Sequence, residues 1–218
     1  IHTIGSGGGS IAELLPGNIL KVGPESAGST PGPACYARGG AAATTTDANV
    51  VLGYYDEANF LGGRVDFDGQ ASKDAVGAIA SDMGVSLTEA AQGIVRVINT
   101  QMAEGIRIVS VRAGADPRHF ALLSFGGAAG LHIADIARLL DIKRVIIPRS
   151  ASVLSAFGML ASDLRYEQVR SVMKSLKDLS QDDLFNLVED MRGLVDQKLN
   201  KLESLLESRR HDLALDMR

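Results

Sequence analysis

Residues 120–148 read FALLSFGGAAGLHIADIARLLDIKRVIIP, and this stretch decides the fold. It begins with an apolar run of strand length at 120–125, followed by a tight turn of small residues at 126–130. Apolar residues then recur at helical spacing over 129–140, and a second buried strand is expected at 144–148. A strand, a helix and a strand joined by short connections are typical of a βαβ unit with a parallel sheet. The sequence therefore predicts an α/β fold.

Helical patterns lie on both sides of this unit. Ser86 and Glu89 form a capping box, in which both side chains satisfy N–H groups at a helix start, and a helix over 87–112 is expected behind it. A short helix is expected at 153–162. An apolar stripe opposite a charged face predicts one continuous helix over 180–208. We expect that stripe to be buried in the intact protein or covered by a partner helix or a second copy.

The N-terminal third is rich in Gly, Ala, Pro and Thr. Residues 1–5 have the pattern of a strand that runs into a glycine loop. Residues 12–85 are expected to form an ordered insertion of loops and a hairpin, because a solvated linker would not carry so many apolar and aromatic groups. Among these groups are Cys35, Tyr36, Val50, Val51, Leu52, Tyr54, Tyr55 and Phe60.

Composition excludes several classes of protein. The 218 residues carry 22 basic and 26 acidic side chains and no basic patch, so nucleic acid is not an expected partner. A single cysteine rules out a disulfide within the chain and favours a reducing cytoplasm. No apolar run approaches the ~20 residues that span a bilayer, so a membrane is not expected either. Because both ends stand flush with strand-like segments, 1–5 and 213–218, we expect a piece of a longer protein.

Two glycine segments are candidates for binding a phosphate or a nucleotide. Backbone without Cβ atoms at Gly5, Gly7, Gly8 and Gly9 would let an oxyanion approach its N–H groups, although such a run is also common in plain turns. The segment Gly126, Gly127 and Ala128 follows a strand of the βαβ unit, where ligands of open α/β sheets bind. A flat ring such as adenine could lie on this bare backbone, or the glycines could serve close packing of strand and helix.

Four side chains are metal or substrate candidates by residue type: His2, Cys35, Asp47 and His132. Their spacing matches no known ligand pattern. A histidine can instead be a hydrogen-bonded structural residue, and Asp47 can brace a turn. We expect His2, Cys35 and Asp47 to share one cleft near the glycine loop.

Several motifs together resemble the hydantoinase A/5-oxoprolinase family, which includes N-methylhydantoinase and the acetone and acetophenone carboxylase subunits. HTIGSGGGSIA at 2–12 is similar to the family's HTIGAGGGSIA, and FGGAAGLH at 125–132 to its FGGAGPLH, with Ala129-Gly130 where Gly-Pro is usual. Further similar blocks lie in order at 22–28, 31–36, 46–53, 60–63, 116–118, 155–158 and 215–218.

The resemblance implies an actin-like ATPase core made of two ribonuclease-H-like halves. Residues 1–165 would be the second half, with residues 1–5 as its third strand and the insertion at about 12–85. Residues 166–218 would be the long helix leading into a following strand. The family's acidic-glycine phosphate motif, of the form DxGGT, has no match in the sequence. The 218 residues alone are therefore not expected to turn over ATP.

The resemblance also implies an activity, namely ATP-dependent opening of a cyclic amide or imide through phosphorylation of its carbonyl oxygen. ATP and Mg²⁺ would be the cofactors, with Zn²⁺ or Mn²⁺ as other divalent candidates. The partners would be a small cyclic amide, further copies of the chain and a hydantoinase B-like subunit. An ATP-dependent carboxylase subunit is the alternative within the family, and a non-catalytic assembly module is the alternative outside it.

Overall fold

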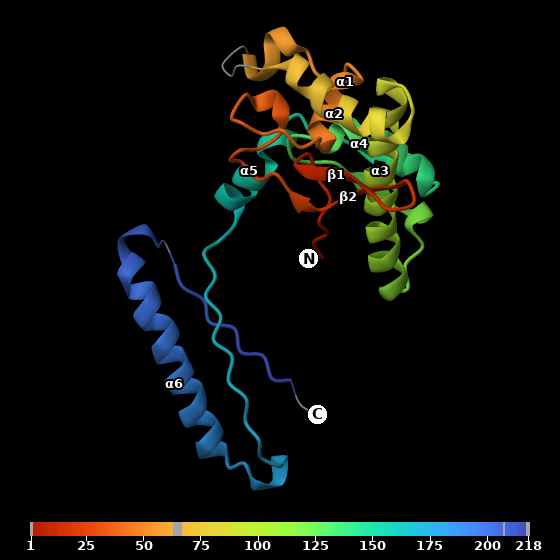
Figure 1. Ribbon diagram of the computed structural model, residues 1–218. Helices are drawn as coiled ribbons and strands as arrows, with labels where there is room; N and C mark the ends of the chain where they lie inside the picture. Colours follow the sequence, from red (N-terminus) through yellow and green to blue (C-terminus); the bar gives the residue numbers. More distant parts are fainter. Residues whose placement is uncertain (1, 63–66, 207, 217–218) are drawn as a thin grey trace. The chain divides into compact units, whose positions relative to one another are not determined.

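The computed structural model describes residues 2–62, 67–206 and 208–216. The chain separates into two compact units, Ile1–Leu160 and Ala161–Arg218 (Figure 1). The resemblance placed a division between residues 165 and 166, and the compact units divide between 160 and 161.

The predicted βαβ unit is confirmed. Strand β3 (Ala121–Leu123) and strand β4 (Arg144–Ile146) pair in parallel, with Leu122 opposite Val145, and helix α4 (Ala129–Leu139) connects them. Each strand is only three residues long, shorter than the apolar runs predicted. In the described residues, each of the two strands has one edge that pairs with no other strand. A parallel sheet is most stable when further strands pair with its edges and helices cover its faces.

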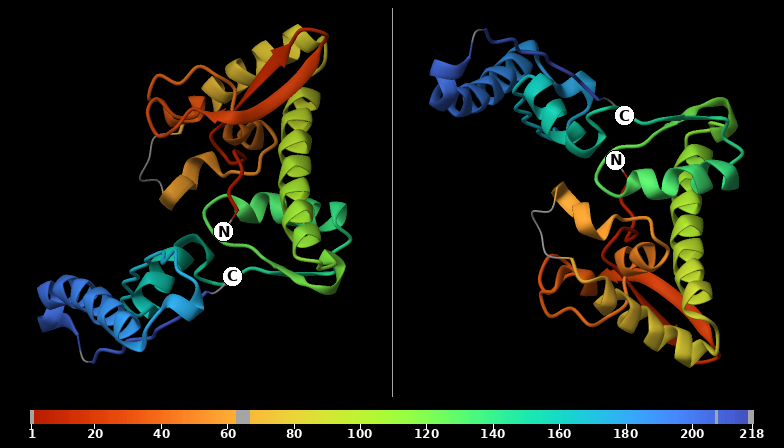
Figure 2. Two further views of the ribbon diagram at one scale, coloured as in Figure 1. Left: turned by 90° about the horizontal axis from the view of Figure 1, so that it is seen from below. Right: turned by 90° about the horizontal axis from the view of Figure 1, so that it is seen from above.

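Helix α3 (Leu87–Arg112) is the long element around which the first unit is built. It has the predicted bounds and the predicted capping box between Ser86 and Glu89. Figure 2 shows the N-terminal hairpin at one end of α3 and α4 at its other end. Two apolar cores follow the helix in turn: the first includes Val22, Ala48, Val76, Ile94 and Ile98, and the second Ala103, Ile136, Ala137, Leu140 and Ile142.

The strand predicted at residues 1–5 is wrong for the described residues 2–5. A strand needs a neighbour for its N–H and C=O groups, and no strand of the described chain pairs with this segment. The hairpin instead follows the glycine loop. Strand β1 (Ser10–Leu15) pairs antiparallel with strand β2 (Ile19–Ser26), and the chain turns between Leu15 and Ile19.

In its described residues the predicted insertion is ordered, and it contains helices as well as the hairpin. Helix α1 (Thr45–Val51) and helix α2 (Gly69–Met83) pack on the first core, and short 3-10 turns lie at Ala34–Tyr36 and Glu57–Gly62. An aromatic cluster holds the segment around the second turn, with Phe60 and Phe67 ring centroids 4.5 Å apart. Tyr36 and Tyr55 complete this cluster. Helix α1 was not predicted.

Short elements complete the first unit. A 3-10 turn at Pro117–His119 follows α3, and a second at Ala151–Val153 follows β4. Helix α5 (Leu154–Ala161) agrees with the helix expected at 153–162. In the described residues, no helix combines the length and the apolar character needed to cross a bilayer.

The second unit is built on helix α6 (Gln181–Leu199), which a 3-10 turn at Leu176–Asp178 precedes and another at Asn200–Leu205 follows. The prediction of one continuous helix over 180–208 is therefore wrong in extent, since α-helical hydrogen bonding ends at Leu199. The strand expected at the end is also not found in the described residues 208–216. A strand there would again need a neighbour.

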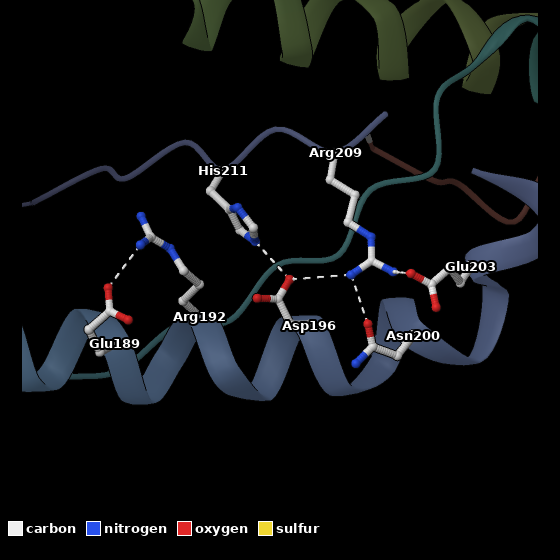
Figure 3. Close-up of polar contacts among 7 residues, drawn as sticks. All are labelled: Glu189, Arg192, Asp196, Asn200, Glu203, Arg209 and His211. Atoms are coloured by element: carbon white, nitrogen blue, oxygen red, sulfur yellow. Dashed lines mark hydrogen bonds and ion pairs between the residues drawn. The ribbon is translucent and has the colours of Figure 1, made fainter. Parts of the chain in front are cut away.

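Polar contacts tie the segment after the last 3-10 turn back to α6 (Figure 3). Asp196 accepts from His211 Nε2 at 3.0 Å and lies 3.9 Å from Arg209 Nη1. Arg209 also donates to Asn200 Oδ1 at 2.7 Å and faces Glu203 at 3.5 Å. These partners lie at the point where the helix tightens into the 3-10 turn, and they hold the returning chain beside it.

Candidate functional site

The glycine loop is seated on the first turn of α1. The carbonyl oxygen of Gly8 accepts from the backbone N–H of Thr46 at 2.8 Å and from Thr46 Oγ1 at 2.9 Å. A Cβ atom on Gly8 would lie 2.7 Å from that hydroxyl. Glycine is therefore required at position 8 by the contact with α1.

The other glycines of the loop differ in their surroundings. A Cβ on Gly5 would meet Pro24 at 2.6 Å, and one on Gly9 would meet Ser26 Oγ at 2.7 Å, so both are packed against β2. A Cβ on Gly7 would meet nothing within 4 Å. Packing thus explains Gly5, Gly8 and Gly9. At Gly7 the space for a side chain is open, but its N–H donates to Ser10 Oγ at 3.0 Å and its carbonyl accepts from the Ser10 N–H at 3.1 Å.

Asp47 is fully buried and accepts hydrogen bonds from three parts of the insertion. Its Oδ1 accepts from the N–H of Cys35 at 2.9 Å and from Ser72 Oγ at 2.7 Å. Its Oδ2 accepts from the N–H of Ala34 and from both the N–H and the hydroxyl of Thr44. The carboxylate is saturated by donors, so this arrangement leaves no coordination site for a metal ion on Asp47.

Cys35 lies beside Asp47 and is also fully buried. Burial, followed by the negative charge of Asp47, raises the pKa of the thiol to about 12. The side chain therefore stays a neutral thiol at physiological pH. A thiol in this state is neither a nucleophile nor a metal ligand, both of which need the thiolate.

His2 lies apart from this pair, on the exposed side of the glycine loop. It lines a hollow of about 380 Å³ between residues 2–6, Pro24 and the α3 side chains Gln101 and Glu104. No hydrogen bond joins His2 to Cys35 or Asp47 in the described chain. The structure thus brings Cys35 and Asp47 together and connects them with Gly8 through α1, while His2 lies in the hollow beside Gly5.

His132 is buried in α4 with both ring nitrogens engaged. Nδ1 lies 2.7 Å from Asn99 Oδ1 of α3, and Nε2 lies 3.3 Å from Asn49 Nδ2 of α1. Burial lowers the pKa of His132, against the opposing charge of Asp135, so the ring is held neutral. Neither nitrogen is free for a metal ion in this arrangement.

The second glycine segment follows β3 and leaves its backbone open. Gly126 has a φ of +98°, and its N–H donates to the carbonyl of Ala151 at 2.8 Å. A Cβ atom on Gly126 or on Gly127 would meet nothing within 4 Å. Close strand–helix packing therefore does not explain these glycines. The positive φ accounts for Gly126, whereas at Gly127 the space beside the backbone is open.

Metal binding by His2, Cys35, Asp47 and His132 stays a prediction to which the described residues add no support. They contain no group of three or more His, Cys, Asp or Glu side chains that could hold a metal ion. The functional layout depends instead on Thr44, Thr46, Asn49 and Asn99, which sequence reasoning missed. One signal was present: Thr44 and Asp47 have capping-box spacing, and both reciprocal hydrogen bonds are formed at the start of α1.

Comparisons with known proteins place these features in a wider context. The family model for hydantoinase/oxoprolinase matches residues 1–168. The caprolactamase subunit alpha of Pseudomonas jessenii is 47% identical over 179 residues, which cover 82% of this chain and 26% of that protein.

Two solved structures are also similar. A crystal structure of the ATP-dependent caprolactamase from Pseudomonas jessenii matches with a TM-score of 0.66 and 43% identity, over 89% of this chain and 28% of that one. A nucleotide-free structure of acetone carboxylase, described for ATP-dependent acetone carboxylation, matches with a TM-score of 0.73 and 31% identity, over 91% and 29%. The chain thus spans between a quarter and a third of the length of these relatives.

Proposed function

Because the chain belongs to the hydantoinase/oxoprolinase family, we propose that it forms part of an ATP-dependent enzyme that opens a cyclic amide or imide by hydrolysis. The observation that carries this proposal is the 47% identity to a caprolactamase subunit, whose name describes action on a cyclic amide. Since the chain covers 26% of that relative, the activity is proposed for the whole protein.

The chemistry explains why such an enzyme would need ATP. An amide is stabilised by resonance, and its nitrogen is a poor leaving group. Phosphorylation of the carbonyl oxygen by ATP would remove this resonance and activate the carbon, so that water could add to it and the ring C–N bond could break. The amine and an acyl phosphate would form, and hydrolysis of the acyl phosphate would release a carboxylate and phosphate. Phosphoryl transfer depends mainly on positioned donors and on electrostatic stabilisation. Open backbone that can approach phosphate is therefore the kind of contribution expected from this chain.

We propose that two segments contact the nucleotide. Gly126, Gly127 and Ala128 have the open backbone on which an adenosine group would lie. The glycine loop would lie near the phosphates, with no side chain at Gly7 to keep them away. The parallel βαβ unit agrees with one ribonuclease-H-like half of an actin-like core, and this architecture is part of the proposal.

No residue of this chain is assigned to Mg²⁺. Asp47 has its oxygens filled by protein donors, and the described residues offer no other carboxylate cluster. Mg²⁺, or Zn²⁺ or Mn²⁺ in its place, would be held by other parts of the protein or by the nucleotide itself.

Partner subunits belong to the same proposal. The caprolactamase relative is named as a subunit, which supports a hydantoinase B-like partner and assembly of several chains. Carboxylation is the second candidate function, and the TM-score of 0.73 against acetone carboxylase is the observation that favours it.

The proposal is tested with the full-length protein and its partner subunit. ADP release and ring-opened product would be measured with hydantoin, 5-oxoproline and caprolactam, and ADP release with acetone plus bicarbonate as the competing reaction. We expect ATP consumption that depends on one of the cyclic amides and matches the amount of ring opened. ATP consumption driven only by ketone and bicarbonate would replace the hydrolase proposal with the carboxylase.

A second experiment tests the nucleotide position. Gly127→Val places a side chain in open space, so the fold should be kept. The Michaelis constant for ATP should rise while kcat changes little, because the variant weakens the binding of the substrate and of the transition state equally. Thermal unfolding would show that the variant is folded. Unchanged ATP kinetics in the folded variant would remove Gly127 from the site.

A further inference from the structure

Buried hydrogen bonds connect the two glycine segments through helix α1. The first connection is the double contact of Thr46 with the Gly8 carbonyl, which fixes the glycine loop on the start of the helix. Asn49 lies nearly one turn further along α1 and is also fully buried. A displacement of α1 would therefore move the glycine loop with it.

The second connection joins Asn49 to His132, and its direction follows from the groups around it. Asp135 only accepts hydrogen bonds, so Asn99 turns Nδ2 toward it, at 3.5 Å, and presents Oδ1 to the histidine. The proton of the neutral ring must then be on Nδ1, which donates to Asn99 Oδ1. Nε2 is left as an acceptor, and Asn49 Nδ2 donates to it.

The Asn49 side chain depends on this contact. Its Oδ1 is buried and has no hydrogen-bond partner among the described residues. The bond from Nδ2 to His132 is thus the side-chain hydrogen bond by which Asn49 holds α1 against α4.

The third connection is short, because His132 lies in the first turn of α4, directly behind residues 126–128. The start of α4 has no side-chain cap, since Ala128 occupies the N-cap position. His132 therefore attaches an otherwise uncapped helix start to α1 on one side and, through Asn99, to α3 on the other.

We infer that His132 is a positioning residue, which holds the two proposed nucleotide-binding segments in one arrangement through its hydrogen bond with Asn49. This inference rests on the proposed function. It gives His132 a role that needs no metal ion and no contact with substrate.

Two substitutions at His132 separate positioning from general stability. In His132→Asn the amide can replace Nδ1 and keep the bond to Asn99, but it does not reach Asn49. In His132→Gln the longer side chain places an oxygen near the position of Nε2 and keeps the bond to Asn49. Both variants remove the imidazole ring and lose one of its two hydrogen-bond partners. If His132 only stabilised the fold, the two variants should therefore have similar Michaelis constants.

The readout is the Michaelis constant for MgATP in the full-length enzyme with its partner subunit. We expect His132→Asn to raise it about fivefold, the size expected from one buried hydrogen bond, and His132→Gln to stay within about twofold of wild type. Asn49→Ala removes the same bond from α1 and should raise the constant as His132→Asn does. Ser86→Ala, which removes a hydrogen bond at the start of α3 and leaves α1, α4 and both glycine segments untouched, is the stability control.

The outcomes are distinct. Equal increases in His132→Asn and His132→Gln, or an unchanged constant in either folded Asn49→Ala or folded His132→Asn, would overturn the inference. If His132→Asn does not fold, Asn49→Ala and His132→Gln decide the matter. If the wild-type enzyme consumes no ATP with any cyclic amide or ketone, the proposed function itself fails and the inference fails with it.

Discussion

At the residue scale, two residues of the same type can have different surroundings. Gly7 and Gly8 are neighbours in one glycine run, yet only Gly8 has a neighbouring atom where a Cβ would stand. Cys35 and Asp47 are plausible metal ligands by type, yet one is a neutral buried thiol and the other a saturated acceptor. At this scale a residue's chemistry is decided by its contacts.

The glycine pair gives a direct test of this point. In Gly8→Ala the new Cβ would lie 2.7 Å from Thr46 Oγ1, and rotation of that hydroxyl would break its bond to the Gly8 carbonyl. We expect a loss of about 1–3 kcal/mol in the free energy of unfolding. Gly7→Ala, which meets nothing, should stay within about 0.5 kcal/mol of wild type. Urea denaturation of both variants checks the difference, and equal stabilities would contradict the packing of the loop on α1.

Cys35 predicts a dependence of stability on alkaline pH. The unfolded thiol loses its proton near the ordinary pKa of 9.0, whereas the folded thiol keeps it up to about 12. Between these two pH values the thiol loses its proton in the unfolded state but keeps it in the folded state. This ionisation stabilises the unfolded state, so the contribution of Cys35 to the free energy of unfolding falls as pH rises. Urea denaturation at pH 8 and pH 10 should show a steeper loss for wild type than for Cys35→Ala. Parallel losses would show that the thiol titrates normally in the folded chain.

Helix α3 is the element that organises the first unit, because its two halves contribute to different cores. Its start is set by sequence-local chemistry, namely the reciprocal bonds of Ser86 and Glu89. Helix α1 starts with the same kind of box at Thr44 and Asp47, but there the acidic residue also binds the turn at Ala34 and Cys35. The same local motif is thus exposed in one helix and buried in the other.

Removing the cap of α3 should weaken both cores together. Ser86→Ala takes away the hydroxyl that accepts from the Glu89 N–H, and such a loss costs about 1 kcal/mol of stability. Thermal unfolding and hydrogen exchange along α3 would measure it. We expect the first turn to lose protection while the unfolding transition shifts to lower temperature. A transition that matches wild type would show that the box contributes nothing to the start of α3.

At the scale of the whole molecule, the chain exposes many large apolar side chains. The exposed apolar side chains of the β3–β4 region and α5 include Leu123, Phe125, Ile146, Ile147, Phe157 and Leu160. Large exposed apolar side chains that gather on one surface usually mark a protein interface. In the second unit the stripe of α6 is only partly buried, with Leu184, Leu187 and Val188 all at intermediate exposure.

The 218-residue chain by itself should therefore self-associate. Apolar surface gains free energy when a second copy removes it from water, so association should increase with protein concentration. Sedimentation velocity at several concentrations measures this directly. Phe157→Ser or Leu160→Ser, at exposed positions of α5, should weaken association with little loss of stability. A chain that stays strictly monomeric at every concentration would contradict the prediction.

The sequence by itself determined the elements whose signals are local. The capping box and apolar period gave α3 its bounds, and the alternation of apolar runs with small-residue turns gave the βαβ unit. The family, too, could be identified from motifs alone. These features were predictable because the spacing of residues within one segment is enough to specify them.

Only the tertiary structure decided the state of the candidate site residues. Asp47 and Cys35 meet through a turn, a helix and α2, and His132 meets Asn49 and Asn99 from two other helices. The strand predicted at residues 1–5, of which 2–5 are described, and the helix predicted over 180–208, which ends at Leu199, were wrong for a related reason. A strand forms only beside a partner strand. The residue at which a helix ends depends on the chain segments that contact it. Such partners are distant in sequence, and a linear pattern contains no information about which of them will meet.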